Sequence, residues 1–285
     1  MNTEKNKKIW LKKCEETLKM GGRSEVTIRN YIFIIKKFLN CYEDTIKISK
    51  LTIADLTKHF KKYFLDKNKS ASTYNTNLSA IRYFYLVCFD RNISKTLLPT
   101  SKIRKRYPTI ISKEQFLTIV NKEENLKHKC WLLLSFCCGL RICEVATLRV
   151  ENINSKEHKL KVLGKGNKER FTILPDIVIK YLRLYYKNQK FIHKTGYMFI
   201  GNSNKPHIDP RRVGNYFTGL KKDYQLPKEI TEHSLRHSFA TYYLMNGGDL
   251  LTLKSMMGHK SLASTSIYIH MSNDFNNLKG IDYAK

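Results

Sequence analysis

Six polar side chains in the last two thirds of the chain define the chemistry that this sequence could perform. A guanidinium can bind two non-bridging phosphate oxygens at once. An imidazole can accept a proton near neutral pH, and a hydroxyl can act as a nucleophile. Together with an ammonium group, such a set could bind a phosphodiester, attack it and protonate the departing oxygen without a metal ion. The six residues are, in chain order, Arg141, Lys165, His233, Arg236, His259 and Tyr268.

The strongest local pattern is the pair His233 and Arg236. They are three residues apart in a predicted helix, so they project from one helical face. Arg141 follows Gly139 at a predicted helix start, and Glu144, three residues further on, is expected to hold its guanidinium. Taken one at a time, these patterns also fit an ordinary core histidine or a surface ion pair.

Lys165 lies at the tip of a predicted β-hairpin. The segment Lys159–Leu174 contains two short alternating stretches on either side of Gly164–Asn167, whose glycines suit a tight turn. A lysine at such a tip could reach a DNA groove and donate a proton to a leaving alkoxide. Most exposed hairpin lysines are only solvated, so this position carries weight only together with the others.

His259 and Tyr268 complete the set near the end of the chain. Gly258 is expected to end a helix over Leu250–Met257, so that His259 emerges from the end of that helix. The chain has 17 tyrosines, and residue type alone therefore does not select Tyr268 as a nucleophile. Tyr268 is selected by its place in the chain, after the ordered series of basic residues.

The composition favours a polyanionic partner. The chain has 285 residues, with 52 Lys and Arg against 24 Asp and Glu, which gives a formal net charge of +28. With 42% hydrophobic residues it can also bury a core, so it is not a disordered basic tail. Basic residues exceed acidic ones in both halves, which favours nucleic acid binding over a lysine-rich solubility surface.

Cysteine usage and hydropathy predict a cytoplasmic, nucleoid-associated protein. The seven cysteines form no paired framework, and several lie on apolar helical faces, which is typical of reduced core thiols. The longest apolar run, Trp131–Leu140, is too short to cross a bilayer, and Met1–Lys8 is too polar for a signal peptide. Seven cysteines and nine histidines raise a metal site as an alternative, but no ligand spacing supports one, so no cofactor is expected.

Residues 1–98 are predicted to form a helical domain. Ser24 and Thr52 are expected to cap two of its helices, apolar residues within Tyr74–Cys88 line the face of a third, and an amphipathic segment surrounds Trp10. Lysines and arginines alternate with Tyr, Asn and Thr on the polar faces. Such faces suit phosphate contacts, although many of these lysines are ordinary solvated residues.

A linker over residues 99–111 separates this domain from a second one over residues 112–285. Two prolines, Pro99 and Pro108, oppose a continuous helix there. Ser112 and Gln115 form a capping box that opens the second domain. A buried helix then follows over Leu126–Cys138, and helices again dominate after the hairpin. The basic residues of the linker are Lys102, Arg104, Lys105 and Arg106.

These motifs, in this order, resemble those of the tyrosine recombinase (phage integrase) family, most closely its short Xer-type members. The resemblance extends over nearly the whole chain, because the basic helical domain is similar to the core-binding domain of the family. The matching segments are Gly139–Glu144, Gly164–Arg170, His233–Thr241, Gly258–His259 and Tyr268–His270.

The resemblance implies a mainly α-helical protein with a small β-sheet or hairpin in the C-terminal domain. It implies a two-domain, C-shaped clamp on duplex DNA, with a four-helix core-binding domain and a catalytic domain. The expected partners are specific, inverted-repeat DNA core sites and three further copies of the chain in a tetramer. The expected DNA contacts are Lys102, Arg104, Lys105, Arg106, Lys168 and Arg170.

The resemblance also assigns roles to the six residues. Tyr268 attacks the scissile phosphate and forms a 3′-phosphotyrosyl bond, while Arg141 and Arg236 hold the non-bridging oxygens. His233 helps to deprotonate the tyrosine, and His259 donates a hydrogen bond to the phosphate. The remaining roles belong to Lys165, which protonates the departing 5′-oxygen, and to Glu144, which supports the first arginine.

Alternatives remain open at this point. A type IB topoisomerase uses the same chemistry, and a non-catalytic DNA-binding protein would show the same charge. Within the recombinases, integration and excision of a mobile element, resolution of cointegrates and resolution of chromosome or plasmid dimers all fit. The segment that follows Tyr268, with Leu278 and Ile281, is either exchanged between subunits or a frayed tail.

Overall fold

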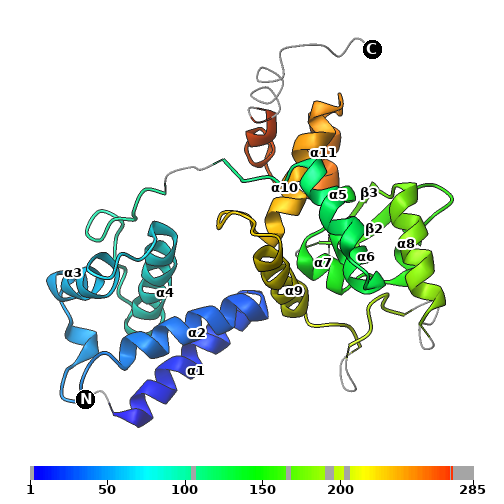
Figure 1. Cartoon of the computed structure of the whole chain (residues 1–285). Coiled ribbons are helices and arrows are strands. Elements are labelled where there is room, and N and C mark those ends of the chain that lie inside the picture. The colour runs from blue at the N-terminus through cyan, green and yellow to red at the C-terminus, as the bar shows by residue number, and fades with distance from the viewer. Residues whose placement is uncertain are drawn as a thin grey trace. The chain divides into compact units, whose positions relative to one another are not determined.

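The computed structural model describes residues 3–103, 107–164, 168–189, 196–201, 206–269 and 271. It divides the chain into two compact units, Met1–Lys105 and Arg106–Lys285 (Figure 1). The boundary between them falls inside the segment that the sequence analysis treats as a linker. Each unit has a hydrophobic core of its own.

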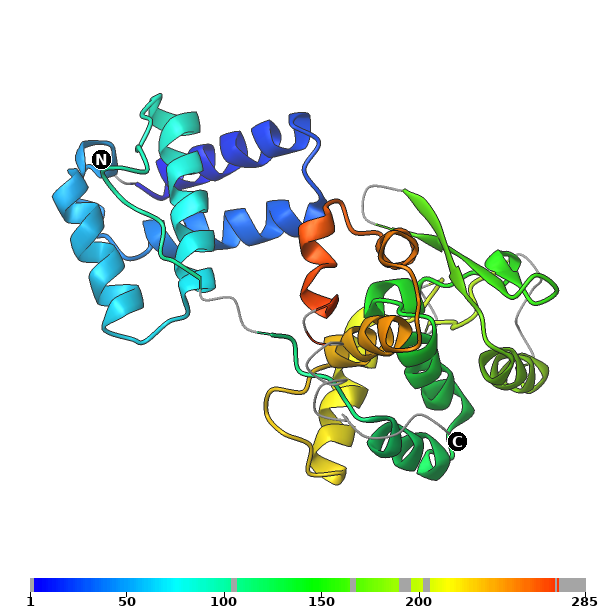
Figure 2. The ribbon, with the colours of Figure 1, turned by 90° about the horizontal axis from the view of Figure 1, so that it is seen from above.

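The described residues of the first unit form four α-helices, as the sequence predicts. They are α1 (Glu4–Met20), α2 (Glu25–Leu39), α3 (Ile53–Phe60) and α4 (Ala71–Phe89), with a short 3-10 helix η1 (Ile48–Lys50) before α3 and a π-helical segment η2 (Lys61–Leu65) after it. Figures 1 and 2 show α1 and α2 side by side, and α4 contacts both.

Local capping fixes where these helices begin. The Ser24 hydroxyl accepts a hydrogen bond from the Thr27 N–H at 3.3 Å, and Thr52 forms a reciprocal capping box with Asp55. Both predicted caps are therefore confirmed. The core between the helices mixes aliphatic and aromatic side chains, with Phe84 and Tyr85 fully buried.

In the second unit the helices surround α6. The predicted capping box of Ser112 and Gln115 opens the first of them, and α6 contacts α5, α7, α8, α9 and α10. Its buried residues run without interruption from Cys130 to Ser135, which explains why this segment is apolar on all sides. The helices are α5 (Lys113–Lys122), α6 (Leu126–Cys137), α7 (Ile142–Ala146), α8 (Asp176–Lys187), α9 (Pro210–Asp223), α10 (Glu232–Met245) and α11 (Leu250–Met257), with short turns η3 (Val150–Asn152) and η4 (Leu262–Ser264).

A small antiparallel sheet accompanies these helices. Its strands β1 (Ile153–Asn154), β2 (Lys159–Leu163) and β3 (Glu169–Ile173) are hydrogen-bonded in the order β1-β2-β3. The predicted hairpin is β2 and β3, paired with Lys161 opposite Phe171. The strand β1 was not predicted, because two residues are too short to show alternation. Within the described residues the fold is thus mainly helical with one small sheet, as the sequence predicts.

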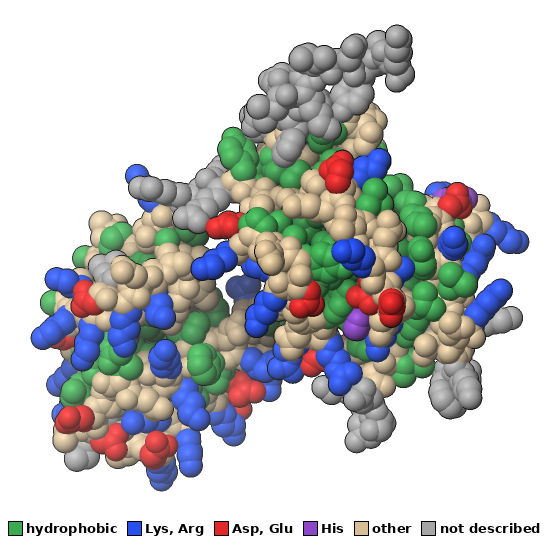
Figure 3. Space-filling model, in the orientation of Figure 1, with side chains coloured by type: hydrophobic (Ala, Val, Ile, Leu, Met, Phe, Trp, Pro, Cys, Tyr) green, Lys and Arg blue, Asp and Glu red, His purple; other side chains and the backbone are tan. Residues whose placement is uncertain are grey.

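The thiols and the surface agree in part with the expectations from composition. All seven cysteines are free, and Cys14, Cys130 and Cys138 are buried, whereas Cys143 is exposed. Figure 3 shows many more Lys and Arg than Asp and Glu side chains on the visible face of each unit. None of the helices in the described part of the chain combines the length and the apolar character needed to cross a bilayer.

Candidate active site

A glycine turn between α6 and α7 places Arg141. Gly139 has a φ of 67°, and a Cβ atom added to it would lie 2.4 Å from Cδ1 of Phe239. Only glycine therefore fits this left-handed turn without displacing the phenyl ring. The turn brings Arg141 to the N-cap position of α7, as the sequence predicts.

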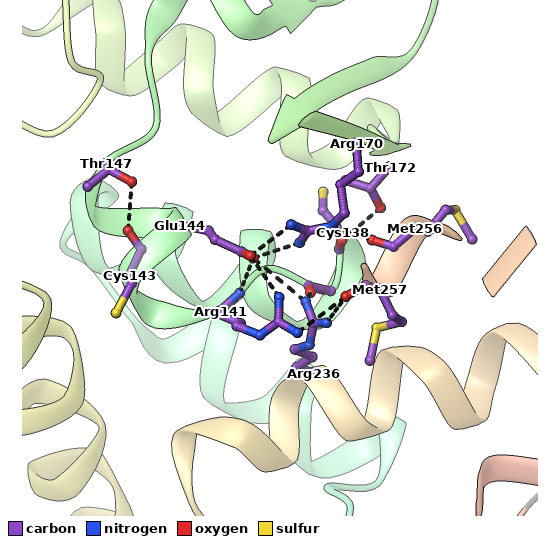
Figure 4. A network of polar contacts seen from close by, with 11 residues as sticks. Cys138, Arg141, Cys143, Glu144, Thr147, Arg170, Thr172, Arg236, Met256 and Met257 are labelled. Carbon is purple, nitrogen blue, oxygen red and sulfur yellow. Dashed lines mark hydrogen bonds and ion pairs between the residues drawn. The ribbon is translucent and has the colours of Figure 1, made fainter. Parts of the chain in front are cut away.

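Three guanidiniums surround the buried carboxylate of Glu144 (Figure 4). Arg141 donates from Nη1 to Oε1 at 2.9 Å, and its backbone N–H donates to Oε2 at 2.8 Å. Arg170 donates from Nη1 and Nη2 to the two carboxylate oxygens at 2.8 and 2.7 Å. Nη1 of Arg236 lies 3.7 Å from Oε2. We call these four residues the arginine cluster.

The end of α11 supplies further acceptors to the arginine cluster. Arg170 donates from Nε to the Met256 carbonyl at 2.7 Å, and Arg236 donates to the carbonyls of Gly139 and Met257. The last carbonyls of a helix lack partners within the helix and carry partial negative charge. They therefore stabilise cations that Glu144 alone could not balance.

The arginine cluster holds an excess of positive charge. Burial alone would raise the pKa of Glu144, but the hydrogen bonds and charge of Arg170, the Arg141 backbone N–H and the charge of Arg236 outweigh it and lower that pKa. Burial and the neighbouring charge of Arg141 lower the pKa of Arg236. Three cations facing one carboxylate leave two positive charges unbalanced. The side chain of Arg141 is 37% exposed, so the cluster can meet an anion from solvent.

The position of Arg170 corrects one expectation. The family resemblance implies that Arg170 contacts DNA, but its side chain is only 7% exposed and its guanidinium is bound to Glu144 and Met256. A contact of Arg170 with DNA does not fit this position. The neighbouring Lys168 is exposed, as is Lys102.

The proposed nucleophile is buried beside α10 and α11. Tyr268 is 2% exposed and belongs to a small core cluster with Phe239 and Leu253. Its hydroxyl lies 2.7 Å from Nδ1 of His237. Burial raises its pKa to about 12, although the charges of Arg236 and Arg141 act in the other direction. The tyrosine is thus protonated at rest and within electrostatic range of the arginine cluster.

His259 lies next to this tyrosine. Gly258 ends α11 with a φ of 60°, as the sequence predicts, and the next residue leaves the helix. The His259 ring is 6.4 Å from the ring of Tyr268 and nearly parallel to it, and its Nδ1 lies 2.9 Å from the Thr265 hydroxyl. Burial and the charges of Arg236 and Arg141 lower the pKa of His259 to about 4, so the imidazole is neutral at pH 7.

His237, and not His233, is the histidine that meets the tyrosine hydroxyl. His233 and Arg236 both lie on α10 at the predicted spacing, but Arg236 is buried and His233 is exposed. Sequence reasoning missed His237, although it follows Arg236 directly and lies one turn after His233 on the same helical face. That position in the motif was the one signal that could have found it.

Some predicted site residues lie outside the described part of the chain. These are the hairpin-tip Lys165, the linker residues Arg104, Lys105 and Arg106, and the segment with Leu278 and Ile281. Among the described residues, no three His, Cys, Asp or Glu side chains converge in a way that could hold a metal ion. What the described residues bring together is a cationic cluster, two neutral imidazoles and a buried tyrosine.

Comparison with known families gives a match over both units. The model of the phage integrase family matches residues 110–274, and that of the phage integrase N-terminal SAM-like domain matches residues 10–95. The chain is 28% identical to tyrosine recombinase XerD of Staphylococcus epidermidis over 265 residues, which cover 88% of this chain and 90% of that protein. XerD of Staphylococcus aureus is 29% identical over 266 residues, with the same coverage.

Solved structures share the fold. The XerH site-specific recombinase bound to palindromic difH substrate, in a post-cleavage complex, matches with a TM-score of 0.74 at 18% identity, over 94% of this chain and 82% of that chain. A lambda integrase dimer bound to a COC′ core site matches with a TM-score of 0.71 at 17% identity, over 91% of this chain and 93% of that chain. At these identities the similarity is evidence for a shared fold.

Proposed function

Because the chain belongs to the phage integrase family, it is a tyrosine site-specific recombinase, and we propose that Tyr268 is the nucleophile with which it cuts and rejoins duplex DNA. The predicted resemblance is thereby confirmed, and the topoisomerase and non-catalytic alternatives are not favoured. One observation carries the assignment of the nucleophile. Tyr268 is a buried tyrosine within electrostatic range of a cluster with two unbalanced positive charges.

The first step of the proposed reaction forms one bond and breaks another. The Tyr268 oxygen attacks the scissile phosphorus, the bond from phosphorus to the 5′-oxygen breaks, and a 3′-phosphotyrosyl bond remains. Arg141 and Arg236 bind the non-bridging oxygens, where negative charge builds up in the transition state. Since the phosphodiester energy is retained in the protein–DNA bond, a 5′-hydroxyl of a partner duplex can reseal it without ATP.

The remaining groups manage protons and hydrogen bonds in this proposal. Thr265 can donate to Nδ1 of His259, which leaves the Nε2–H of that ring to donate to the phosphate. His233 assists proton removal from the tyrosine. Lys165 protonates the departing 5′-oxygen. Glu144 holds Arg141 in place through two hydrogen bonds.

The proposed substrate is duplex DNA with inverted-repeat core sites. The net charge of +28 supports contacts with phosphates along a duplex. The XerH structure contains a palindromic substrate and the lambda integrase structure a core site, which are the kinds of site we propose for this chain. Exchange between two duplexes requires four active sites, so the proposed working form is a tetramer on nucleoid DNA in the cytoplasm. Its task is mobile-element integration, excision or cointegrate resolution, or the resolution of DNA dimers.

A covalent trapping experiment tests the proposal. The protein is incubated in EDTA with a pool of nicked duplexes whose inverted-repeat arms are randomised. A nick beside the scissile phosphate lets the short fragment that bears the new 5′-hydroxyl diffuse away, so the strand cannot be resealed and the adduct is trapped. We expect a covalent band from the wild type, with one enriched sequence, and no band from Tyr268→Phe. Tyr185→Phe, another buried tyrosine of the same unit, is the matched control and keeps the band. A band of equal strength from Tyr268→Phe overturns the assignment.

A further inference from the structure

His237 makes a direct contact with the reacting oxygen of the proposed mechanism. Its Nδ1 lies 2.7 Å from the Tyr268 hydroxyl, and the two ring centroids are 5.8 Å apart with 39° between the ring planes. Within the described residues this is the one hydrogen bond that the Tyr268 hydroxyl makes. The nearby His259 cannot offer its Nδ1 instead, because that atom is bonded to Thr265.

The direction of this hydrogen bond follows from the surroundings of both groups. Burial raises the pKa of Tyr268, so the phenol keeps its proton and can donate it. Burial and the nearby His233 and Arg236 lower the pKa of His237 to about 4, so the imidazole is neutral at pH 7 and can accept. A buried hydroxyl without an acceptor is unfavourable. The favoured arrangement is therefore the phenolic O–H donating to Nδ1, with the ring proton on Nε2.

This arrangement controls where the oxygen lone pairs point. A phenolic proton directed at Nδ1 fixes the rotation of the O–H bond, which leaves the lone pairs of the oxygen available for phosphorus. His237 is itself held on α10, the helix that also carries Arg236. One helix therefore carries both the group that orients the nucleophile and one of the proposed phosphate-binding guanidiniums.

We propose that His237 is a positioning residue for Tyr268, whose Nδ1 accepts the phenolic hydrogen bond and orients the oxygen for attack. This inference rests on the proposed function, because it takes Tyr268 as the nucleophile. It goes beyond the six residues that the motifs identify. It assigns His237 to the nucleophile directly, as the acceptor of the phenolic hydrogen bond.

The geometry of the bond suggests a test by conservative rescue. In asparagine the Oδ1 atom is attached to Cγ, as Nδ1 is in histidine, so His237→Asn keeps an acceptor in the same place. His237→Leu removes the acceptor, and His237→Gln moves it one bond further out. The readout is the single-turnover rate of covalent adduct formation at saturating DNA, measured together with the Kd for DNA and the Tm of each variant.

We expect His237→Leu and His237→Gln to form the adduct about tenfold to a hundredfold more slowly, since small misplacements of a reacting group have effects of that size. His237→Asn should react within about threefold of the wild type by the same reasoning. The Kd for DNA should be unchanged in all three. A wild-type rate in His237→Leu overturns the inference, and so does an Asn variant as slow as the Leu variant. If His237→Leu does not fold, the comparison of Asn with Gln decides. A wild type that forms no adduct refutes instead the proposed function.

Discussion

The arginine cluster and the tyrosine segment, residues 265–269, are held in opposite ways. In the cluster, Glu144, the Gly139 carbonyl and the last carbonyls of α11 give Arg170 and Arg236 several acceptors each. In the tyrosine segment, the hydroxyl of Tyr268 has one hydrogen-bond partner among the described residues, and the backbone is held by short-range bonds such as Tyr268 N–H to the Thr265 carbonyl at 3.0 Å. The charged groups are thus fixed by many polar contacts, whereas the hydroxyl of the nucleophile is oriented by a single one.

This difference separates two requirements of the proposed reaction. Stabilising transition-state charge requires cations that do not reorganise when the charge develops, and multiple hydrogen bonds provide that rigidity. A nucleophile must form a bond to phosphorus and give it up again when the strand is resealed. A single hydrogen bond can orient the oxygen and, because its net contribution to stability is modest, can be exchanged for the bond to phosphorus at low energetic cost. Substitutions in the two regions should therefore differ in how strongly they change the rate of cleavage and the free energy of unfolding.

The largest effect is expected from Arg236→Ala. The cluster would lose a buried guanidinium that faces the proposed phosphate site, and cleavage should fall by about a hundredfold to a thousandfold, as when one preorganised donor is removed from an enzyme site. DNA binding should persist, because the many exposed lysines and arginines are unchanged. The rate of adduct formation and the Kd for DNA measure the two effects separately.

A matched arginine and a conservative variant control this prediction. Arg183→Ala removes an exposed arginine that donates to Ser155 at 3.1 Å and should leave cleavage unchanged. Arg236→Lys keeps the charge but not the two-pronged geometry, and it should remain defective. Unchanged cleavage in Arg236→Ala would remove this residue from the site and the cluster from its proposed role.

Arg170→Gln should act on stability instead. It removes two hydrogen bonds to Glu144 and one to the Met256 carbonyl, all buried, and leaves that carboxylate with fewer partners. Breaking a buried pair from one side is strongly destabilising, so the free energy of unfolding should fall by about 3 kcal/mol. Urea denaturation at pH 7 measures this. Lys161→Gln is the control, because its ion pair with Glu169 on the same hairpin is exposed and is expected to contribute less than about 1 kcal/mol. Equal losses of unfolding free energy in the two variants would show that the hydrogen bonds of the cluster stabilise the fold no more than a surface ion pair does.

Sequence reasoning recovered the features that depend on neighbouring residues. The caps at Ser24 and Thr52 were predicted from residue type and spacing, as were the glycine turns at Gly139 and Gly258. The pairing of Arg141 with Glu144 followed from a three-residue spacing. In each case the chemical partner lies within one helical turn, so the chain itself sets the geometry.

Features that depend on distant partners were missed or misplaced. Arg170 is a basic residue beside the hairpin tip, which is why a DNA contact was predicted for it. Its partner Glu144 is 26 residues away and buried, and the charge of a residue does not reveal whether it is buried. His237 meets Tyr268 across 31 residues, and periodicity alone could not specify that contact. The sequence thus identified the family motifs but not which histidine binds the hydroxyl.

The smallest effect is expected from Thr265→Val, which tests the few contacts of the tyrosine segment. The substitution keeps the shape of a fully buried side chain but removes the hydroxyl that bonds Nδ1 of His259. The free energy of unfolding should fall by about 1 kcal/mol, the net contribution of one hydrogen bond. Cleavage should slow by about tenfold or less, because the imidazole loses its fixed orientation toward the phosphate without losing its donor. Thr218→Val, whose hydroxyl donates to the Gly214 carbonyl on an exposed face of α9, should change neither quantity. If Thr265→Val slowed cleavage as much as Arg236→Ala, the reaction would depend on the contacts of the tyrosine segment as strongly as on those of the arginine cluster. The proposed difference between the two regions would then be wrong.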